Sequence, residues 1–324
     1  MFSVVILNYN GQEFLSGCLG SILAADGSLV TEIIVVDNGS SDGSVKTIRK
    51  FQISKPKFQT SSKSQISKIK LIENRRNLGF AKAANQGILA AKEDFVVLIN
   101  NDLRLDKQWF LEAKKAIEKW HKKEPVAAYF GKVLNWQGTE IESTGLVYWL
   151  KGKSLNRGNG LSAKTDRYQK EEFVFGPSAS VVVYYQPALV QAGLFDEDFF
   201  AYEEDVDLNL RLNNAGWKTL YSPKMIAYHL GGGTSRKMGN FRQRMDTKNW
   251  WFIIIKNYPV SILVKYGLSI FIERLRNLSG LIKATAWYRI PATLLATYGE
   301  LLLKLPKLLK KRKPVRENIL LALK

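Results

Sequence analysis

The chain has 324 residues, of which 46% are hydrophobic and 24% charged, so it can bury the core of one large domain with an appendage or of two small domains. Its net charge is +19, and most of the excess lies in residues 236–324, which hold 19 Lys and Arg against four Asp and Glu. We therefore expect a nearly neutral body with a basic tail. The single cysteine, Cys18, excludes an internal disulfide, and we expect it to be a core thiol in a reducing compartment.

Neither a secretory leader nor a membrane-spanning helix is predicted. The N-terminal run Met1–Leu7 lacks basic residues and is typical of a buried strand. In the tail, Lys256, Pro259 and Lys265 interrupt the longest hydrophobic segment, which leaves fewer than the roughly 18 apolar residues that a spanning helix needs. We therefore expect a cytoplasmic protein that does not cross the membrane.

Apolar, β-branched runs alternate with helical spacing over the first hundred residues. Strands are expected at 3–7, 32–36, 69–72 and 95–99, with helices at about 14–23 and 81–91. This alternation predicts a mostly parallel sheet, and ligands bind beyond the carboxyl ends of the strands in such sheets. Polar residues stand at three of those ends: Asn8-Tyr9-Asn10, residues 37–42 and Asn100-Asn101-Asp102. We expect them to form a binding site.

The remaining pattern continues the sheet and adds two irregular segments. The Lys/Ser/Gln-rich stretch Arg49–Lys70 is interpreted as an exposed, mobile insertion, and Gly152–Ser162 as a loop that could close over the site. The other expected elements are a basic helix at about 107–123, strands at 126–134, 173–185 and 225–228, and a helix that begins near residue 205.

Asp37 and Asp102 each have two interpretations. Asp37 follows the most hydrophobic strand, where it could bind a base or a ribose, or could accept hydrogen bonds from the backbone of the next turn. Asp102 follows the fourth strand, where one carboxylate could hold a divalent metal already bound to a diphosphate, or could cap a following helix.

Carboxylates crowd between Phe195 and Asp207, just before an apolar helical pattern. An acid in the first turn of a helix is favourable through capping and the helix dipole, by roughly 0.5 to 2 kcal/mol, but that requires only one acid. Adjacent Glu204 and Asp205 exceed this requirement, and their repulsion would raise one pKa, as a general base near neutrality needs. His229 follows a strand beside a glycine turn, so it is either structural or a metal ligand, whereas His121 is expected on the solvated surface.

Together these motifs resemble family 2 glycosyltransferases of the GT-A fold, nearest to the rhamnosyltransferase-like branch, over about residues 1–235. The residues that carry the resemblance are, in order, Val5-Ile6-Leu7-Asn8-Tyr9-Asn10, Val35-Val36-Asp37-Asn38-Gly39-Ser40-Ser41-Asp42-Gly43-Ser44, Asn77-Leu78-Gly79-Phe80-Ala81, Asn85 with Gly87, Leu98-Ile99-Asn100-Asn101-Asp102, Phe195-Asp196-Glu197, Glu204-Asp205-Val206-Asp207-Leu208, Arg211, Gly216-Trp217 and His229. An ordered set is far more specific than any one motif.

The resemblance implies an α/β fold with a Rossmann-like, mostly parallel central sheet flanked by helices. It implies a nucleotide-sugar-binding half at 1–105 and an acceptor-binding and catalytic half at 106–235. The tail lies outside the resemblance, and its own pattern predicts a basic amphipathic helical extension at 236–324. The implied nucleotide-sugar site consists of Asn8, Asn10, Asp37, Gly79, Asn85 and Asn101.

The resemblance also implies a catalytic base and a metal. Asp205 would be the base, with Glu204 beside it, and Asp102 would bind Mg²⁺ or Mn²⁺ as part of the family's Asp-x-Asp motif. Asn100 replaces the first Asp of that motif, which leaves one carboxylate, with His229 as a second ligand as in some relatives.

Hydrophobic runs alternate with Lys and Arg in the tail, as in helices that lie at a membrane interface, and Trp250, Trp251, Trp287 and Tyr288 suit a headgroup region. The segment Lys307–Lys313 adds a predicted patch for anionic lipid. We expect peripheral attachment to the cytoplasmic face of the membrane. A helical dimerisation element or a solvated run of charge are the alternatives.

The leading hypothesis is an inverting, metal-dependent glycosyltransferase that moves rhamnose or another hexose from deoxythymidine diphosphate rhamnose or a uridine diphosphate hexose to a lipid-linked or cell-surface glycan. A catalytically silent relative that binds sugar nucleotides is the first alternative. A basic nucleic-acid-binding protein is the second, but the carboxylates lie in the body and the tail is too apolar, so we expect no nucleic-acid partner.

Overall fold

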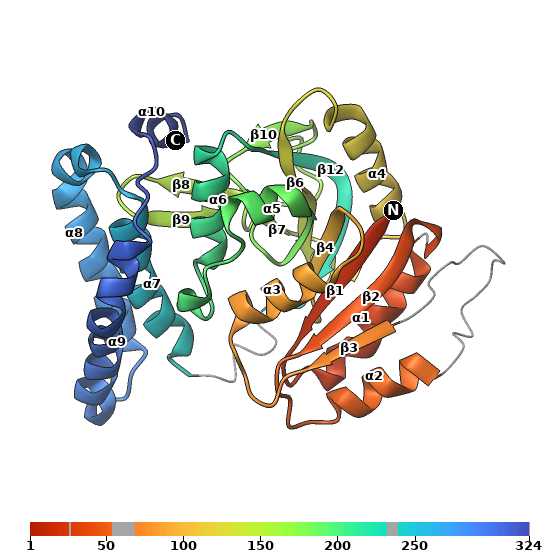
Figure 1. The fold of residues 1–324 in the computed structure, drawn as a ribbon, viewed down its shortest axis with the longest axis horizontal. Coiled ribbons are helices and arrows are strands. Elements are labelled where there is room, and N and C mark those ends of the chain that lie inside the picture. Colours follow the sequence, from red (N-terminus) through yellow and green to blue (C-terminus); the bar gives the residue numbers. More distant parts are fainter. Residues whose placement is uncertain (26, 54–68, 232–238, 324) are drawn as a thin grey trace.

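The computed structural model describes residues 1–25, 27–53, 69–231 and 239–323, and its elements are shown in Figure 1. The strands are β1 (Phe2–Asn8), β2 (Val30–Asp37), β3 (Ile69–Glu73), β4 (Phe95–Asn100), β5 (Leu103–Leu105), β6 (Val126–Asn135), β7 (Ile141–Ser143), β8 (Leu146–Trp149), β9 (Lys153–Asn156), β10 (Glu172–Val174), β11 (Val181–Tyr185) and β12 (Lys218–His229). The helices are α1 (Gln12–Ala24), α2 (Ser44–Ile53), α3 (Phe80–Ala90), α4 (Trp109–Trp120), α5 (Gln186–Ala192), α6 (Glu204–Asn214), α7 (Phe241–Asn257), α8 (Val260–Lys283), α9 (Ile290–Lys310) and α10 (Glu317–Ala322). The single turns η1 (Gly27–Leu29), η2 (Glu197–Phe199) and η4 (Trp287–Arg289) are 3₁₀-helical.

One mixed sheet forms the centre of the body, with strand order β10-β12-β6-β11-β4-β1-β2-β3. Pairing is parallel through β4-β1-β2-β3 and between β6 and β12, as the alternating pattern predicts. Strand β11 runs antiparallel between β4 and β6. Because Asn8 is in register with Asp37 and Leu7 with Asn100, the polar ends of β1, β2 and β4 lie along one edge of the sheet.

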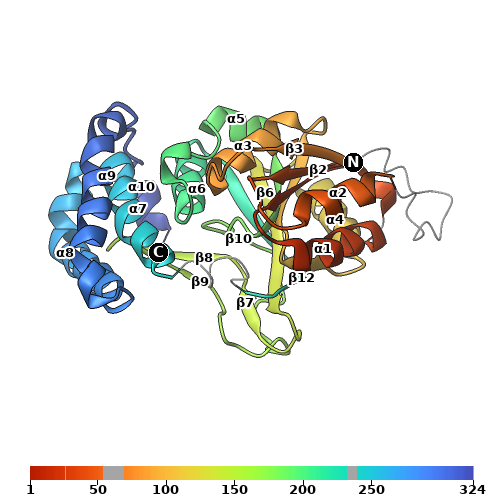
Figure 2. The ribbon, with the colours of Figure 1, turned by 90° about the horizontal axis from the view of Figure 1, so that it is seen from below.

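Helices cover both faces of the sheet, which explains why its central strands are hydrophobic throughout. One face packs on α1, α2 and α4 through residues such as Leu15, Ile48 and Trp109. The other packs on α3, α5 and α6 through residues such as Ile88 and Leu208. Figure 2 shows these layers edge-on. The rigid sheet therefore fixes the positions from which the polar strand ends project.

The C-terminal helices share a hydrophobic core with the body. Tyr148, Phe199 and Val206 of the body pack in one cluster with Trp250 and Phe252 of α7. Helices α8 and α9 each pack on α7, and all three stand together at one end of the molecule (Figures 1 and 2). No helix of the described residues is long and apolar enough to cross a membrane.

Several local expectations need correction. The predicted insertion begins inside α2, which runs to Ile53, and its residues 54–68 lie outside the described part of the chain. The stretch 173–185 forms two strands, β10 and β11, and the predicted loop 152–162 contains β9, which pairs with β8.

The structure also tests the expectations for the side chains of His121 and Cys18. His121 is half-buried, with its ring 4.5 Å from that of Tyr185, because aromatic neighbours cover it. Cys18 is buried in the core, as expected, and burial together with the Asp102 charge raises the pKa of its thiol. The chain divisions at 105 and 235 remain predictions.

Candidate functional site

A buried network joins the ends of β1, β2 and β4. Asn8 Nδ2 donates to Asp37 Oδ2 (2.7 Å), and Asn101 Nδ2 donates to Asn8 Oδ1 (2.6 Å). Asp37 also accepts from the Ser40 backbone N–H (2.9 Å) and the Ser40 hydroxyl (2.7 Å), so it does satisfy the turn that follows it. Three of the predicted nucleotide-sugar residues, Asn8, Asp37 and Asn101, are thus in one hydrogen-bonded group.

Asn10 lies beside this network and shapes the loop after β1. Its backbone is left-handed (φ 48°), its N–H donates to Ser40 Oγ (2.9 Å), and its Oδ1 accepts from Ser41 N (2.8 Å). A short polar side chain tolerates this conformation better than an apolar one. Asn10 therefore ties the β1 and β2 loops together.

Gly79 and Asn85 hold the turn before the carboxylate cluster. Gly79 has φ +87°, and a Cβ there would lie 2.5 Å from the Phe200 carbonyl oxygen, so a side chain would not fit. Asn85 donates to the Phe195 carbonyl (2.9 Å) and accepts from the Phe195 N–H (3.0 Å). Both residues position other parts of the site, and their contact with a nucleotide sugar stays a prediction.

Asp102 and His229 meet on the other side of the network. Asp102 is followed by β5, so the alternative of a helix cap is wrong. Since β5 pairs with β12, His229 Nε2 comes within 3.3 Å of Asp102 Oδ1, and its Nδ1 within 2.5 Å of Glu142 Oε1. Burial lowers the pKa of His229, but hydrogen bonds to Asp102 and Glu142 outweigh it and raise the pKa to about 10.

Asp102 and His229 fit a divalent cation in their chemistry. A carboxylate oxygen and a neutral imidazole nitrogen in mutual reach are ligands that Mn²⁺ accepts, and a cation here would displace the proton that His229 carries on Nε2. In the described part of the chain no three His, Cys, Asp or Glu side chains are grouped to hold a metal. A cation here would therefore complete its coordination with other ligands, such as phosphate oxygens.

The loop before β11 links Asp205 to the end of β4. Asn100 N donates to the Ser180 carbonyl (2.9 Å), and the neighbouring Ala179 N donates to Asp205 Oδ2 (3.2 Å). Asp205 Oδ1 also accepts from Val206 N (2.8 Å). The first turn of α6 is thereby placed beside the polar edge of the sheet, and Asp205 remains partly exposed there.

Four carboxylates influence one another around that turn. Burial raises the pKa values of Glu203 and Glu204 well above the usual range, and neighbouring charges raise them further. Burial also raises the pKa of Asp205, although the backbone N–H groups of Ala179 and Val206 oppose the rise. Asp246 of α7, raised by burial to about 6, is the fourth. Repulsion between the neighbouring carboxylates raises their pKa values, as the sequence predicts, but burial raises these pKa values more.

The turn before α6 is strained and is held from α7. Phe200, Tyr202 and Glu203 all have φ between 65° and 68°, a region that is costly for residues other than glycine. Asn249 of α7 is fully buried, and its Nδ2 lies within donating distance of the carbonyls of Phe199 (3.0 Å), Ala201 (2.9 Å) and Tyr202 (2.7 Å). Asn249, which belongs to the tail, thus supports the backbone turn that positions Asp205, the candidate base.

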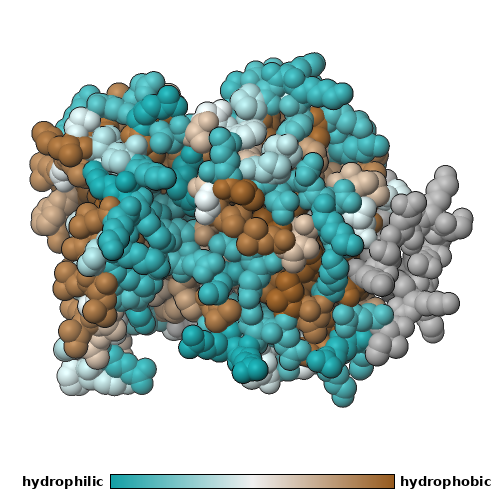
Figure 3. Space-filling view, viewed as in Figure 1, coloured by the Kyte–Doolittle hydropathy of each residue, from teal (hydrophilic) through white to brown (hydrophobic). Residues whose placement is uncertain are grey.

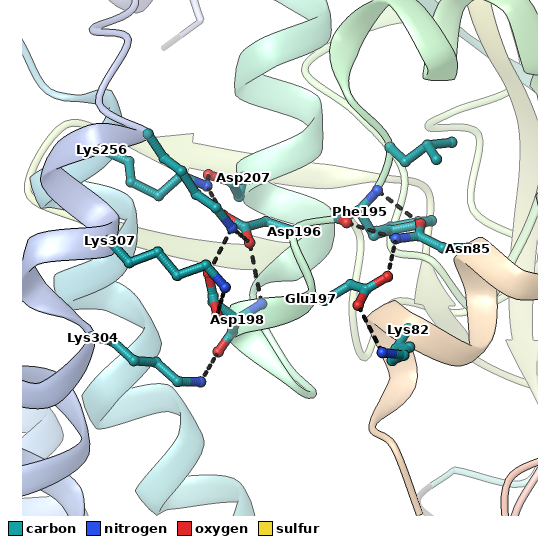
Figure 4. Close-up of polar contacts among 12 residues, drawn as sticks. Lys82, Asn85, Phe195, Asp196, Glu197, Asp198, Asp207, Lys256, Lys304 and Lys307 are labelled. Atoms are coloured by element: carbon teal, nitrogen blue, oxygen red, sulfur yellow. Dashed lines mark hydrogen bonds and ion pairs between the residues drawn. The ribbon is translucent and has the colours of Figure 1, made fainter. Parts of the chain in front are cut away.

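Ion pairs join the rest of the acidic cluster to the tail (Figure 4). Lys256 Nζ lies 2.6 Å from Asp196 Oδ2 and 2.8 Å from Asp207 Oδ1, and all three residues are buried. Asp198 pairs with Lys307 (2.8 Å) and Lys311 (2.6 Å). Burial alone would raise the pKa values of these carboxyls, but the lysines hold them below their usual range.

The structure therefore divides the acidic stretch into two groups. Asp196, Asp198 and Asp207 face lysines of the tail, whereas Glu203, Glu204 and Asp205 belong to the candidate site. The remaining acid, Glu197, pairs with Lys82 of α3 (3.4 Å; Figure 4). Sequence reasoning did not find Glu142, Asp246 and Asn249, because no local pattern around them differs from an ordinary strand end or helix. The many acids between Phe195 and Asp207, in a chain with a basic tail, were the signal in the sequence for these ion pairs.

Known proteins resemble this chain in sequence and in fold. A family model described as Glycosyl transferase family 2 matches residues 3–165. The N-acetylglucosaminyl-diphospho-decaprenol L-rhamnosyltransferase of Mycobacterium tuberculosis is 27% identical over 267 residues, which cover 72% of this chain and 77% of that protein.

Two solved structures share the fold. A mannosyltransferase from Pyrobaculum calidifontis, in complex with GDP-Man and Mn²⁺, has a TM-score of 0.54 at 16% identity and covers 99% of this chain and 85% of its own. GalNAc-T7 with UDP, GalNAc and Mn²⁺ has a TM-score of 0.61 at 14% identity. The match covers 95% of this chain and 57% of that one. The expected GT-A fold is confirmed.

Proposed function

The chain belongs to glycosyl transferase family 2 and transfers a sugar from a nucleotide sugar, and from this premise we propose an inverting, metal-dependent reaction that delivers rhamnose or another hexose to a lipid-linked or cell-surface glycan. The observation that carries the proposal is a continuous set of contacts along one edge of the sheet. Hydrogen bonds join Asp37 to Asn8 and Asn8 to Asn101, the next residue in the chain is Asp102, and Asp102 contacts His229. The Asn100 backbone bonds to Ser180 in the loop before β11, and the neighbouring Ala179 bonds to Asp205.

Asp205 is the better candidate for the base than Glu204. Its two oxygens accept backbone N–H groups, which favours the ionised form that a base needs, and it is only partly buried. Glu204 is buried, and within the described residues its Oε2 has no hydrogen-bond partner, which favours the protonated form.

The reaction is a single displacement. The acceptor hydroxyl attacks the anomeric carbon, Asp205 takes its proton, and the bond from that carbon to the diphosphate breaks, so the configuration inverts. Such proton transfer contributes roughly 10²- to 10⁴-fold in rate. A divalent cation held by Asp102 and His229 would supply positive charge to the departing diphosphate.

Asp37, with Asn8 and Asn10, would hold the nucleoside of the donor. Deoxythymidine diphosphate rhamnose or a uridine diphosphate hexose suits this role. The name of the mycobacterial relative supports rhamnose as the sugar and a diphospholipid-linked sugar as the acceptor. An acceptor of that kind would place the enzyme at the cytoplasmic face of the membrane.

A donor panel tests the proposal. Release of nucleoside diphosphate would be measured from several sugar nucleotides with Mn²⁺, Mg²⁺ or chelator, in the presence of a bacterial lipid extract as acceptor. We expect turnover of one donor only with metal, and a product of inverted anomeric configuration by NMR. Asp205→Asn should lower the rate about a thousandfold.

Asp166→Asn, an exposed carboxylate in the loop after β9, is the matched control and should keep full activity. Retained activity in Asp205→Asn would overturn the choice of base. Nucleotide binding without consumption of any donor would favour a silent relative.

A further inference from the structure

Exposed hydrophobic side chains are concentrated at one end of the molecule. Of the 20 large hydrophobic residues exposed in the described part of the chain, 13 lie between Val260 and Leu309. Figure 3 shows hydrophobic residues gathered along the end formed by α8 and α9. A contiguous apolar surface of this kind marks a docking surface more often than chance exposure.

The exposed residues of α8 form a regular row. Val260, Val264, Leu268, Phe271 and Leu275 follow one another at intervals of four, four, three and four, which places them on one face of a helix. Val264 and Leu268 expose 80% and 75% of their surface. We call this set the α8 row.

Exposed aromatic residues follow α8 in the chain. Trp287 and Tyr288 lie in η4, the turn between α8 and α9, and Trp287 is 82% exposed. Trp and Tyr are enriched where a protein meets the headgroup layer of a membrane. The α8 row and η4 thus combine the apolar and the amphipathic parts of an interfacial element.

Positive charge accompanies this face, and the acids of α8 and α9 are turned away from it. Lys265 and Lys283 are 18 residues apart, five helical turns, so they share a line beside the α8 row, and Arg289 lies next to Tyr288. The one acid of α8, Glu273, is buried against Lys151 and Lys153. The one acid of α9, Glu300, pairs with Lys248.

The basic segment 307–313 is less available than its composition suggests. Lys307 and Lys311 pair with Asp198, and Arg312 donates to the carbonyls of Ile255 and Tyr258. These cations stabilise the fold against the body. Within this segment Lys310 and Lys313 stay exposed, so contact with anionic lipid would involve these two and residues outside the segment.

From these observations we propose that the α8 row and η4 form a membrane-binding face that lies on an anionic bilayer, with Lys265, Lys283 and Arg289 contacting the headgroups. A second copy packed on this face with the α8 helices antiparallel would bring the two basic lines together, where they repel, whereas anionic lipid complements them. The inference stands on the geometry of α8 and does not require sugar transfer.

Vesicle flotation of the full chain tests this face. Vesicles of phosphatidylcholine, with and without phosphatidylglycerol, would be floated with wild type and variants. We expect wild type to bind the anionic vesicles, and Leu268→Asp with Phe271→Asp to abolish binding. Replacing Lys265, Lys283 and Arg289 by Ser should weaken binding to anionic vesicles about fivefold per residue, about a hundredfold together.

Leu89→Asp with Val190→Asp is the matched control, because both residues are exposed and hydrophobic but lie on α3 and α5. This control should bind as wild type does, and all variants should keep the wild-type Tm. Wild type that fails to float, or α8-row variants that float as wild type does, would overturn the proposal. A dimer in sedimentation that the α8-row variant dissociates, without any vesicle binding, would assign the face to a second copy instead.

Discussion

At the residue scale, the site depends on side chains that orient the candidate base as well as on the base itself. Asp205 is presented by a strained turn, and Asn249 holds three carbonyls of that turn from another helix. Strain of this kind persists only where the surroundings over-determine it. Asn249 is therefore a positioning residue in the proposed reaction.

Asn249→Ala should lower kcat about a hundredfold, since misplacing a reacting group by about 1 Å costs that much. The KM for the donor should change little, because Asp37, Asn8 and Asn10, which would hold the nucleoside, lie at the ends of β1 and β2. Asn240→Ala is the control, because it removes one hydrogen bond, to Thr285, at the start of the same helix. Equal loss in kcat and in donor affinity would point to general unfolding and contradict a positioning role.

The raised pKa of Asp246 predicts that the free energy of unfolding depends on pH. Its pKa in the folded protein is about 6, above the roughly 3.9 of an unfolded chain, so ionisation opposes folding. Well below pH 3.9 the carboxyl is protonated in both states and costs nothing, whereas well above pH 6 the full cost applies. Asp246→Asn should therefore raise the free energy of unfolding by about 3 kcal/mol at pH 8 and by almost nothing at pH 3, as measured by urea denaturation. A gain of the same size at both pH values would contradict this account.

At the element scale, ion pairs hold helices α7 and α9 of the tail against the body. Lys256 bridges Asp196 and Asp207 on either side of the turn that precedes α6, and Asp207 is completely buried. Removing one partner of such a group leaves an uncompensated charge in the interior. The ion pairs thus fix the same turn that Asn249 supports.

Lys256→Met should lower the free energy of unfolding by about 3 kcal/mol at pH 7. Lys310→Met changes an exposed lysine that has no ion pair within the described residues, so it should have an effect below about 0.5 kcal/mol. Urea denaturation of both variants measures the difference. Equal stability of the two would show that the bridge does not hold the turn.

These elements also show what the sequence could and could not predict. The parallel strands β1 to β4 were predictable because their apolar runs are short, regular and bounded by turns, and the strand ends marked Asn8, Asp37 and Asp102. The role of Asn249 was not predictable, because its partners lie about 50 residues away and are backbone carbonyls. The segment 307–313 is a predicted lipid patch, but composition cannot show that two of its lysines, Lys307 and Lys311, pair with Asp196 and Asp198.

At the scale of the whole molecule, the tail completes the body rather than extending from it. Phe199 and Val206 of the body share a hydrophobic cluster with Trp250, Phe252 and Ile262. Ending the chain after residue 240 would expose that cluster and release the turn. We expect the truncated chain to lose its near-UV circular dichroism and its cooperative unfolding, whereas a truncated chain that unfolds cooperatively would support an independent domain at 1–235.

In the proposed mechanism, Asp37 binds the nucleotide and Asp205 acts only as the base, so nucleotide binding and turnover should be lost separately. Calorimetric binding of UDP and of dTDP with Mn²⁺ would be compared with donor turnover for wild type, Asp37→Ala and Asp205→Asn. The account predicts that Asp205→Asn binds nucleotide as wild type does but loses turnover, and that Asp37→Ala loses binding. Wild-type turnover in Asp205→Asn, or wild-type nucleotide affinity in Asp37→Ala, would contradict it.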